Sequence, residues 1–192
     1  MDKVNYKIID NVLPQQTYSK ISKGILDYPF DWYYSAGIVK HADYESNGGY
    51  FTHMFFYSLY GENVISSKYE LIKPIIHYLQ PTILLRAKAN LYPKYKGEKE
   101  PEVHGYHSDY QFPNSAAIYY LNTNNGFTIL NDGTKIRSIA NRLLLFEGHI
   151  SHSSTNCTDA AFRANINFNY LKPEIPRDTP EQVEENLKNK IY

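Results

Sequence analysis

The sequence is poor in cysteine, because Cys157 is the only one among 192 residues. A single cysteine excludes a disulfide within the chain and fits a reducing compartment. Twenty basic and 20 acidic residues cancel to a formal net charge of +0, so charge does not favour a nucleic-acid partner. The chain also lacks a long apolar run and the apolar core of a signal peptide. We therefore expect a cytoplasmic protein with no membrane partner.

The length and the aromatic content indicate one domain that is rich in strands. A chain of 192 residues is long enough to bury a substantial core, and 19 of its residues are tyrosine, which favours strands. We predict a single domain over residues 1–192. Residues 1–81 would supply an N-terminal strand and supporting helices, residues 82–171 the strand-rich core, and residues 172–192 an accessory helix. Nothing in the sequence indicates an oligomeric state.

Three segments carry helix signals. A helical pattern begins at Pro14, with Tyr18, Ile21 and Ile25 on one face. The apolar spacing of residues 71–79 predicts a second helix, which Pro74 should kink or delay. Thr179 is a suitable N-cap for the C-terminal helix.

Short apolar runs separated by turn signals predict a sandwich or a barrel. Asn125-Gly126 and Asp132-Gly133 are typical of hairpin turns. The expected strands cover residues 5–12, 51–60, 82–92, 115–121, 127–130, 135–139, 142–146 and 163–171.

Residues 82–92 alternate in polarity, which predicts a strand with two different faces. One face is apolar, with Ala87 and Ala89 at its centre. The other face carries Arg86 and Lys88, and charged side chains on a strand usually point into solvent. We expect these two side chains on the surface rather than in a polar site.

A pair of potential metal ligands precedes the later strands. His107 and Asp109 are two residues apart, so a strand would present both side chains on one face. A third ligand could come from His149 or His152, which follow Asp109 by 40 and 43 residues. Two histidines and one carboxylate form the facial triad of non-haem Fe(II) oxygenases. His41-Ala-Asp43 repeats the spacing, but no strand pattern surrounds it, so we favour the later copy.

Several segments follow Asp109 in a fixed order, namely Ala116-Ala-Ile-Tyr-Tyr-Leu-Asn122, Asn125-Gly126, Asp132-Gly133, Asn141-Arg-Leu-Leu-Leu-Phe146, His152 and Arg163-Ala-Asn-Ile-Asn-Phe-Asn-Tyr170. This ordered set resembles the 2-oxoglutarate- and Fe(II)-dependent oxygenases, in particular the short bacterial and phage members of the prolyl 4-hydroxylase-like branch. The resemblance covers residues 82–171.

The resemblance implies a mainly β fold with flanking helices around a double-stranded β-helix, which is a cupin-like jelly-roll. It also implies the iron ligands, with His152 preferred to His149 because small residues follow it; these ligands are His107, Asp109 and His152. Four further residues would contact the cosubstrate, with Arg163 and Tyr120 on its far carboxylate; they are Arg163, Tyr120, Tyr92 and Asn167. His104 and His149 would have supporting roles.

The activity implied is that of a dioxygenase which hydroxylates its substrate and releases succinate and CO2. Fe(II), 2-oxoglutarate and O2 would be required, with ascorbate as an accessory reductant. A prolyl residue in a peptide is the substrate that this branch suggests, and a small molecule is the other class that we retain. A non-catalytic jelly-roll that binds a ligand or a metal is the alternative function.

Overall fold

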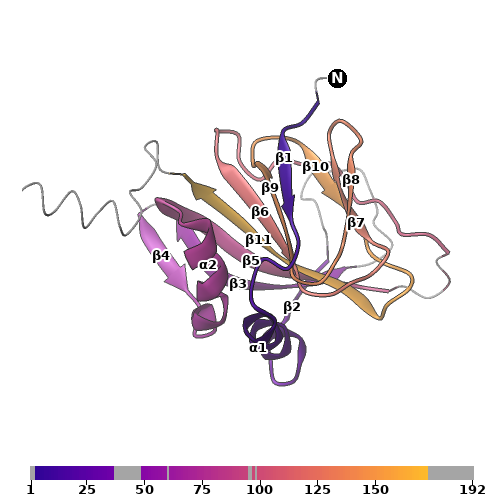
Figure 1. Ribbon diagram of the computed structural model, residues 1–192, viewed down its shortest axis with the longest axis horizontal. Helices are drawn as coiled ribbons and strands as arrows, with labels where there is room; N and C mark the ends of the chain where they lie inside the picture. Colours follow the sequence, from indigo (N-terminus) through magenta and orange to yellow (C-terminus); the bar gives the residue numbers. More distant parts are fainter. Residues whose placement is uncertain (1–2, 37–48, 60, 95–96, 98, 173–192) are drawn as a thin grey trace, which may run out of the picture.

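The computed structural model describes residues 3–36, 49–59, 61–94, 97 and 99–172, and its strands form two antiparallel sheets (Figure 1). The large sheet has the order β1-β9-β6-β11-β5-β3-β2, with β4 paired to β3. Its strands are β1 (Tyr6–Ile9), β2 (Tyr33–Ser35), β3 (Tyr50–Leu59), β4 (Glu62–Ile65), β5 (Ile83–Pro93), β6 (Ser115–Tyr120), β9 (Arg142–Glu147) and β11 (Phe162–Leu171). The small sheet has the order β10-β7-β8 and contains β7 (Phe127–Leu130), β8 (Lys135–Arg137) and β10 (His152–Ser154). The fold is mainly β with a jelly-roll core, as predicted.

Helices cover one face of the large sheet (Figure 1). They are α1 (Gln15–Leu26), the 3-10 helix η1 (Tyr69–Ile72) and α2 (Lys73–Leu79). The predicted apolar face of α1 is confirmed, because Ile21 and Ile25 are buried in one hydrophobic cluster with Phe168 of β11. This cluster also contains the small side chains of Ala87 and Ala89 on β5. Small residues on the strands allow helices to pack closely against the sheet.

A second hydrophobic cluster lies on the other face of the large sheet and includes residues of the small sheet. Along β6, Ala117 and Tyr119 belong to the helix-side cluster, whereas Ile118 and Tyr120 belong to the second one. Leu130 of β7 joins Ile118 and Tyr120 there. The central strands are therefore buried on both faces, because alternate side chains meet two different layers.

Of three local predictions based on proline and glycine, two are confirmed and one is wrong. The delay expected at Pro74 is confirmed, since α2 begins at Lys73 after η1 and carries the proline in its first turn. The hairpin expected at Asp132-Gly133 is also confirmed, and Gly133 has the positive φ of 84° that such a turn requires. The hairpin expected at Asn125-Gly126 is wrong, because this segment links β6 in the large sheet to β7 in the small one.

Some predicted features fall outside the described residues. They are the His41-Ala-Asp43 motif and the accessory helix expected within residues 172–192, of which only Lys172 is described. Among the helices in the described part of the chain, none has the length and apolar character that crossing a membrane would need.

Candidate metal centre and anion pocket

His107 and His152 face each other across a single antiparallel bridge. The backbone N–H of each histidine donates to the carbonyl oxygen of the other at 2.9 Å. Side chains of directly opposed residues lie on the same face of a sheet, and here the centroids of the two rings are 4.7 Å apart. One bridge between the loop before Asp109 and the start of β10 therefore brings together residues that are 45 positions apart in sequence (152 − 107).

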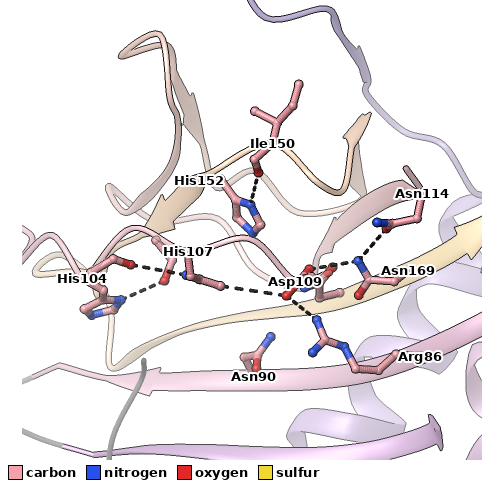
Figure 2. Close-up of polar contacts among 12 residues, drawn as sticks. Arg86, Asn90, His104, His107, Asp109, Asn114, Ile150, His152 and Asn169 are labelled. Carbon is pink, nitrogen blue, oxygen red and sulfur yellow. Dashed lines mark hydrogen bonds and ion pairs between the residues drawn. The ribbon is translucent and has the colours of Figure 1, made fainter. Parts of the chain in front are cut away.

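Both imidazoles use their Nδ1 atoms for backbone contacts (Figure 2). The Nδ1 of His107 is 3.3 Å from the carbonyl oxygen of Gly105, and that of His152 is 3.0 Å from the carbonyl oxygen of Ile150. An Nδ1–H that donates to a carbonyl leaves the lone pair of Nε2 available to a metal. Burial, together with the nearby His152, lowers the pKa of His107 and so favours the neutral ring that a metal requires.

Asp109 is held by three side chains of the large sheet (Figure 2). Arg86 of β5 donates to Oδ1, whereas the amide groups of Asn167 and Asn169 on β11 donate to Oδ2 at 2.9 and 3.0 Å. Burial alone would raise the pKa of Asp109, but Arg86, His152 and these hydrogen bonds outweigh it and hold the pKa well below its usual range. Each carboxylate oxygen has two lone pairs, so this ionised group can still accept a metal.

The structure brings the expected three ligands together. One ligand atom from each of His107, Asp109 and His152 lies within 4.8 Å of the other two. His149 is placed elsewhere: its side chain is 40% exposed and its Nδ1 is 3.6 Å from a carboxylate oxygen of Glu147. Two imidazoles and one carboxylate converging on one point match the donor set of a facial triad. The geometry therefore favours His152 over His149.

Arg163 of β11 is completely buried at the other end of the same cavity. Its guanidinium donates to the hydroxyl oxygens of Ser138 and Thr128 at 3.0 and 3.1 Å, and to the carbonyl oxygen of Thr155 at 3.1 Å. These three bonds leave two of its five N–H groups for a ligand. Within the described residues, no carboxylate lies at ion-pair distance from this cation. A buried charge without a counter-ion is costly, so the site suits an incoming anion.

Gly126 shows how tightly this arginine is enclosed. A Cβ atom added at this position would lie 2.6 Å from Cδ of Arg163 and still closer to the carbonyl oxygen of Asn156. The absence of a side chain at Gly126 therefore gives Arg163 the space that it occupies.

The two predicted tyrosines flank the guanidinium of Arg163, whose Cζ is 5.6 Å from the ring centroid of Tyr92 and 5.7 Å from that of Tyr120. Burial raises the pKa of Tyr92 to about 12, so its hydroxyl remains protonated, and this residue lines the cavity. The hydroxyl of Tyr120 donates to Thr128 at 2.9 Å, and Tyr120 is not part of the cavity wall. Tyr120 therefore orients the hydroxyl group of Thr128 on Arg163.

His104 has the supporting position that the sequence suggested. It is buried, its Nδ1 is 2.8 Å from Oγ of Ser154, and its ring lies 5.1 Å from that of Tyr92. Burial, aided by the charge of Arg163, lowers the pKa of His104 to about 3, so the ring is neutral. His104 thus packs between the Arg163 end of the cavity and β10.

The prediction that Arg86 and Lys88 point into solvent is wrong. Arg86 forms the ion pair with Asp109, and Lys88 lines the cavity with its Nζ 5.7 Å from the ring centroid of Tyr50. The polar face of β5 meets the second layer of the jelly-roll rather than water, because β5 is an interior strand of the large sheet. Local alternation identifies two faces but cannot say which one is covered.

The role of the asparagines on β11 was only partly foreseen. Asn167 faces inward as expected, yet it contacts Asp109. Asn169 makes the same contact, and Asn165 pairs with Asn90 at 3.1 Å. The even spacing from Arg163 was the available signal, since residues i, i+2, i+4 and i+6 share a face.

One cavity joins the triad to Arg163. It encloses about 450 Å³ of space, including part that is open to solvent. Its walls are strongly polar, and the buried amide oxygens of Asn90 and Asn167 have no hydrogen-bond partner among the described residues. Unsatisfied buried acceptors in a cavity indicate water or a polar ligand. The cavity thus offers a metal-ligand cluster, a buried cation and free polar atoms in one connected space.

Solved structures share this fold. A 2OG-Fe(II) oxygenase family oxidoreductase from Burkholderia pseudomallei is 11% identical, with a TM-score of 0.63 over 86% of this chain and 84% of its own. A prolyl hydroxylase from Trichoplax adhaerens, solved with a hypoxia inducible factor peptide, is 18% identical, with a TM-score of 0.60 over 86% and 83%. The α-ketoglutarate-dependent epimerase SnoN of nogalamycin biosynthesis is 12% identical, with a TM-score of 0.58 over 88% and 77%.

No protein-family model matches the sequence, and no curated protein does either. At these identities the structural likeness establishes the fold, which is that of 2-oxoglutarate- and Fe(II)-dependent oxygenases, including prolyl hydroxylases. Because a hydroxylase and an epimerase share it, the fold does not determine the reaction or the substrate.

Proposed function

We propose that this protein is an Fe(II)- and 2-oxoglutarate-dependent dioxygenase. The observation that carries the proposal is the pairing, in one cavity, of a two-histidine, one-carboxylate cluster with a buried arginine that has no counter-ion in the described residues. A group of metal-ligating side chains alone would be compatible with many functions. A cation at the opposite end of the same space supplies the anchor that a dicarboxylate needs when its other end chelates the metal.

The residues fit both groups. His107, Asp109 and His152 would hold Fe(II), because their two imidazoles can present Nε2 and their carboxylate is ionised. Arg163 would hold the far carboxylate of 2-oxoglutarate with its two remaining N–H groups. The hydroxyl of Tyr92, which stays protonated, is a second donor in the cavity. Tyr120 would act through Thr128, and Asn167 through Asp109.

Fe(II) and 2-oxoglutarate, when bound, would supply oxidative decarboxylation with O2, in which one oxygen atom goes into succinate, CO2 is released and the other oxygen atom hydroxylates a C–H bond of the substrate. The protein's own part is to fix geometry. Arg86, Asn167 and Asn169 prevent Asp109 from rotating, and the backbone contacts at Nδ1 fix both imidazole rings. Burial of Arg163 excludes water from the carboxylate anchor and strengthens that ion pair.

A prolyl residue in a peptide is the substrate that we infer at the level of the family, and small molecules form the second class to test. The Trichoplax enzyme of the same fold was solved with a peptide, which supports the first class. Ascorbate would serve to restore Fe(II). A cytoplasmic location belongs to the same proposal, supported by the single cysteine of the chain, Cys157, which allows no internal disulfide.

The test is an anaerobic titration of the metal-free protein with Fe(II) and then 2-oxoglutarate, observing the visible charge-transfer band of the chelate. We expect a band in the wild-type protein and in His149→Ala, which is the matched control because His149 lies outside the cluster. The band should be lost in His152→Ala. Release of succinate in the presence of prolyl peptides or small molecules would then identify the substrate.

A wild-type protein that binds Fe(II) but gives no band would contradict the oxygenase proposal. That result would favour the non-catalytic alternative, in which the jelly-roll binds a metal or an anion without turnover. Equal loss of the band in His149→Ala and His152→Ala would contradict the ligand assignment instead.

A further inference from the structure

Lys88 is a cation of the cavity that the proposed chemistry does not use. It lies on β5 opposite Asn167 of β11, at the level of Asp109, whereas Arg163 pairs with Tyr92 four residues further along β5. Its Nζ lies 5.7 Å from the ring centroid of Tyr50, and Tyr50 in turn stacks on Tyr92 at 5.3 Å. The charge of Lys88 also acts on His107 and on Asp109, so the ammonium group lies near the metal ligands.

The described residues give Lys88 no counter-ion. The nearby carboxylate is that of Asp109, which is already paired with Arg86. No carboxylate of the described chain, Asp109 included, lies within ion-pair distance of Nζ. Burial, with a further contribution from Arg86, lowers the pKa of Lys88 to about 8, so the group is mostly charged at neutral pH and costly to desolvate. An oxyanion beside it would remove that cost.

The charge balance of the cavity indicates where this oxyanion comes from. Lys88 and Arg163 line the cavity, and Arg86 beside it pairs with Asp109, so three cations stand against the single carboxylate of Asp109. A divalent metal and dianionic 2-oxoglutarate cancel each other, so the excess of two positive charges remains after both have bound. A further anion would reduce this excess. The substrate could provide it, because its charge is not part of this balance of protein, metal and cosubstrate.

We propose that Lys88 binds an oxyanion, most simply a carboxylate, at the metal end of the cavity, and that the substrate provides it. This inference rests on the proposed function, because the substrate site is defined by the metal and the cosubstrate. It narrows the substrate to molecules that carry a carboxylate or a similar anion close to the reacting carbon, and so favours the small-molecule class over a prolyl residue within a peptide. The near carboxylate of 2-oxoglutarate is the other source of the same chemistry.

Calorimetric titrations of Mn(II)-loaded protein distinguish the two sources. The ligands are 2-oxoglutarate, 2-oxobutyrate, which lacks the far carboxylate, and acetate added to the 2-oxoglutarate complex as a minimal substrate anion. The variants are Lys88→Met, which keeps chain length, and Lys88→Arg, which keeps charge. We expect Lys88→Met to leave the binding of both oxo acids within twofold and to weaken acetate binding about tenfold, the effect of one charge-assisted hydrogen bond. Lys88→Arg should bind acetate with about the wild-type affinity.

The other outcomes are equally decisive. If Lys88→Met weakens 2-oxoglutarate and 2-oxobutyrate by the same factor, Lys88 does bind an oxyanion, but the cosubstrate provides it. If none of the three titrations changes by more than twofold, the proposal is wrong. Calorimetry detects binding without turnover, so failure of the Lys88 proposal can be distinguished from failure of the oxygenase proposal, which the charge-transfer band tests.

Discussion

The two faces of the β5–β11 pair have opposite compositions and different tasks. On the helix side, Ala164, Ile166 and Phe168 of β11 are buried in an apolar cluster with α1. On the cavity side, Arg163, Asn165, Asn167 and Asn169 are also buried, but they contact polar groups. Neighbouring residues of one strand are thus equally buried, but their side chains contact apolar groups on one face and polar groups on the other. The apolar face should stabilise the fold, whereas the polar face should hold ligands.

The largest expected effect comes from the helix side. Replacing Phe168 with Ala removes a completely buried ring and should lower the free energy of unfolding by about 3–5 kcal/mol. The adjacent substitution Asn167→Ala, on the cavity side, should cost about 1 kcal/mol, because it removes one hydrogen bond to Asp109. Denaturant unfolding of the metal-free proteins measures both. Similar losses in the two variants would show that the polar face also stabilises the fold.

The second-largest expected effect is on the cavity side and concerns the affinity for 2-oxoglutarate. Arg163→Met should weaken binding of 2-oxoglutarate about 100-fold, which corresponds to about 2.7 kcal/mol, because the bidentate anchor for its far carboxylate is lost. Arg142→Met is the matched control, since Arg142 pairs with Asp10 and does not line the cavity. Calorimetry with Mn(II) in place of Fe(II) measures the affinities. An unchanged affinity in Arg163→Met would remove the basis for assigning the cosubstrate.

Much of this arrangement was readable from the sequence, and the rest depended on contacts between distant segments. The spacing of His107 and Asp109 indicated a shared face, and the even spacing after Arg163 indicated that Asn167 follows it. The roles of Arg86 and Lys88 could not be read in this way. A strand shows the same alternation whether its polar face meets water or another layer, and pairing of β5 between β3 and β11 settles that question.

The choice between His149 and His152 was of the same kind. Both lie in one short segment: the resemblance favoured His152 because small residues follow it, and the bridge to His107 is what places it in the cluster. That bridge depends on how the loop before Asp109 passes along the small sheet, which no local pattern specifies. The prediction of a hairpin at Asn125-Gly126 was wrong for a related reason. These residues suit a hairpin turn, but the chain passes from the large sheet to the small sheet there.

A smaller effect should follow from loosening Asp109. Asn169→Leu has a similar volume but no N–H group, so it removes one of the donors to Oδ2. We expect metal binding to weaken about tenfold, as is usual when a group that orients a metal ligand is lost. Asn165→Leu is the control on the same strand and face, because Asn165 pairs with Asn90 instead of Asp109. Mn(II) titration followed by electron paramagnetic resonance measures the difference. Equal weakening in both variants would indicate a general disturbance of the cavity.

The smallest effect concerns the ion pair beside the edge strand β1, outside the β5–β11 pair. Arg142 of β9 forms two hydrogen bonds with the carboxylate of Asp10, at 2.6 and 2.9 Å. Asp10 is half exposed, so Asp10→Asn should cost only about 0.5 kcal/mol of unfolding free energy at neutral pH. The cost should shrink further in 1 M salt, because ions screen exposed pairs.

The stabilisation by the Arg142–Asp10 pair should depend on pH with a defined sign. The hydrogen bond from Arg142 lowers the pKa of Asp10 below its ordinary value of 3.8. A carboxylate with a lowered pKa in the folded state contributes its stabilisation above the unfolded value and loses it as the pH falls through the folded one. The difference between Asp10→Asn and the wild-type protein should therefore be constant from neutral pH down to about 5 and should decrease below 3.8. Urea unfolding across that range measures it, and a difference that grows on acidification would contradict the assigned pair.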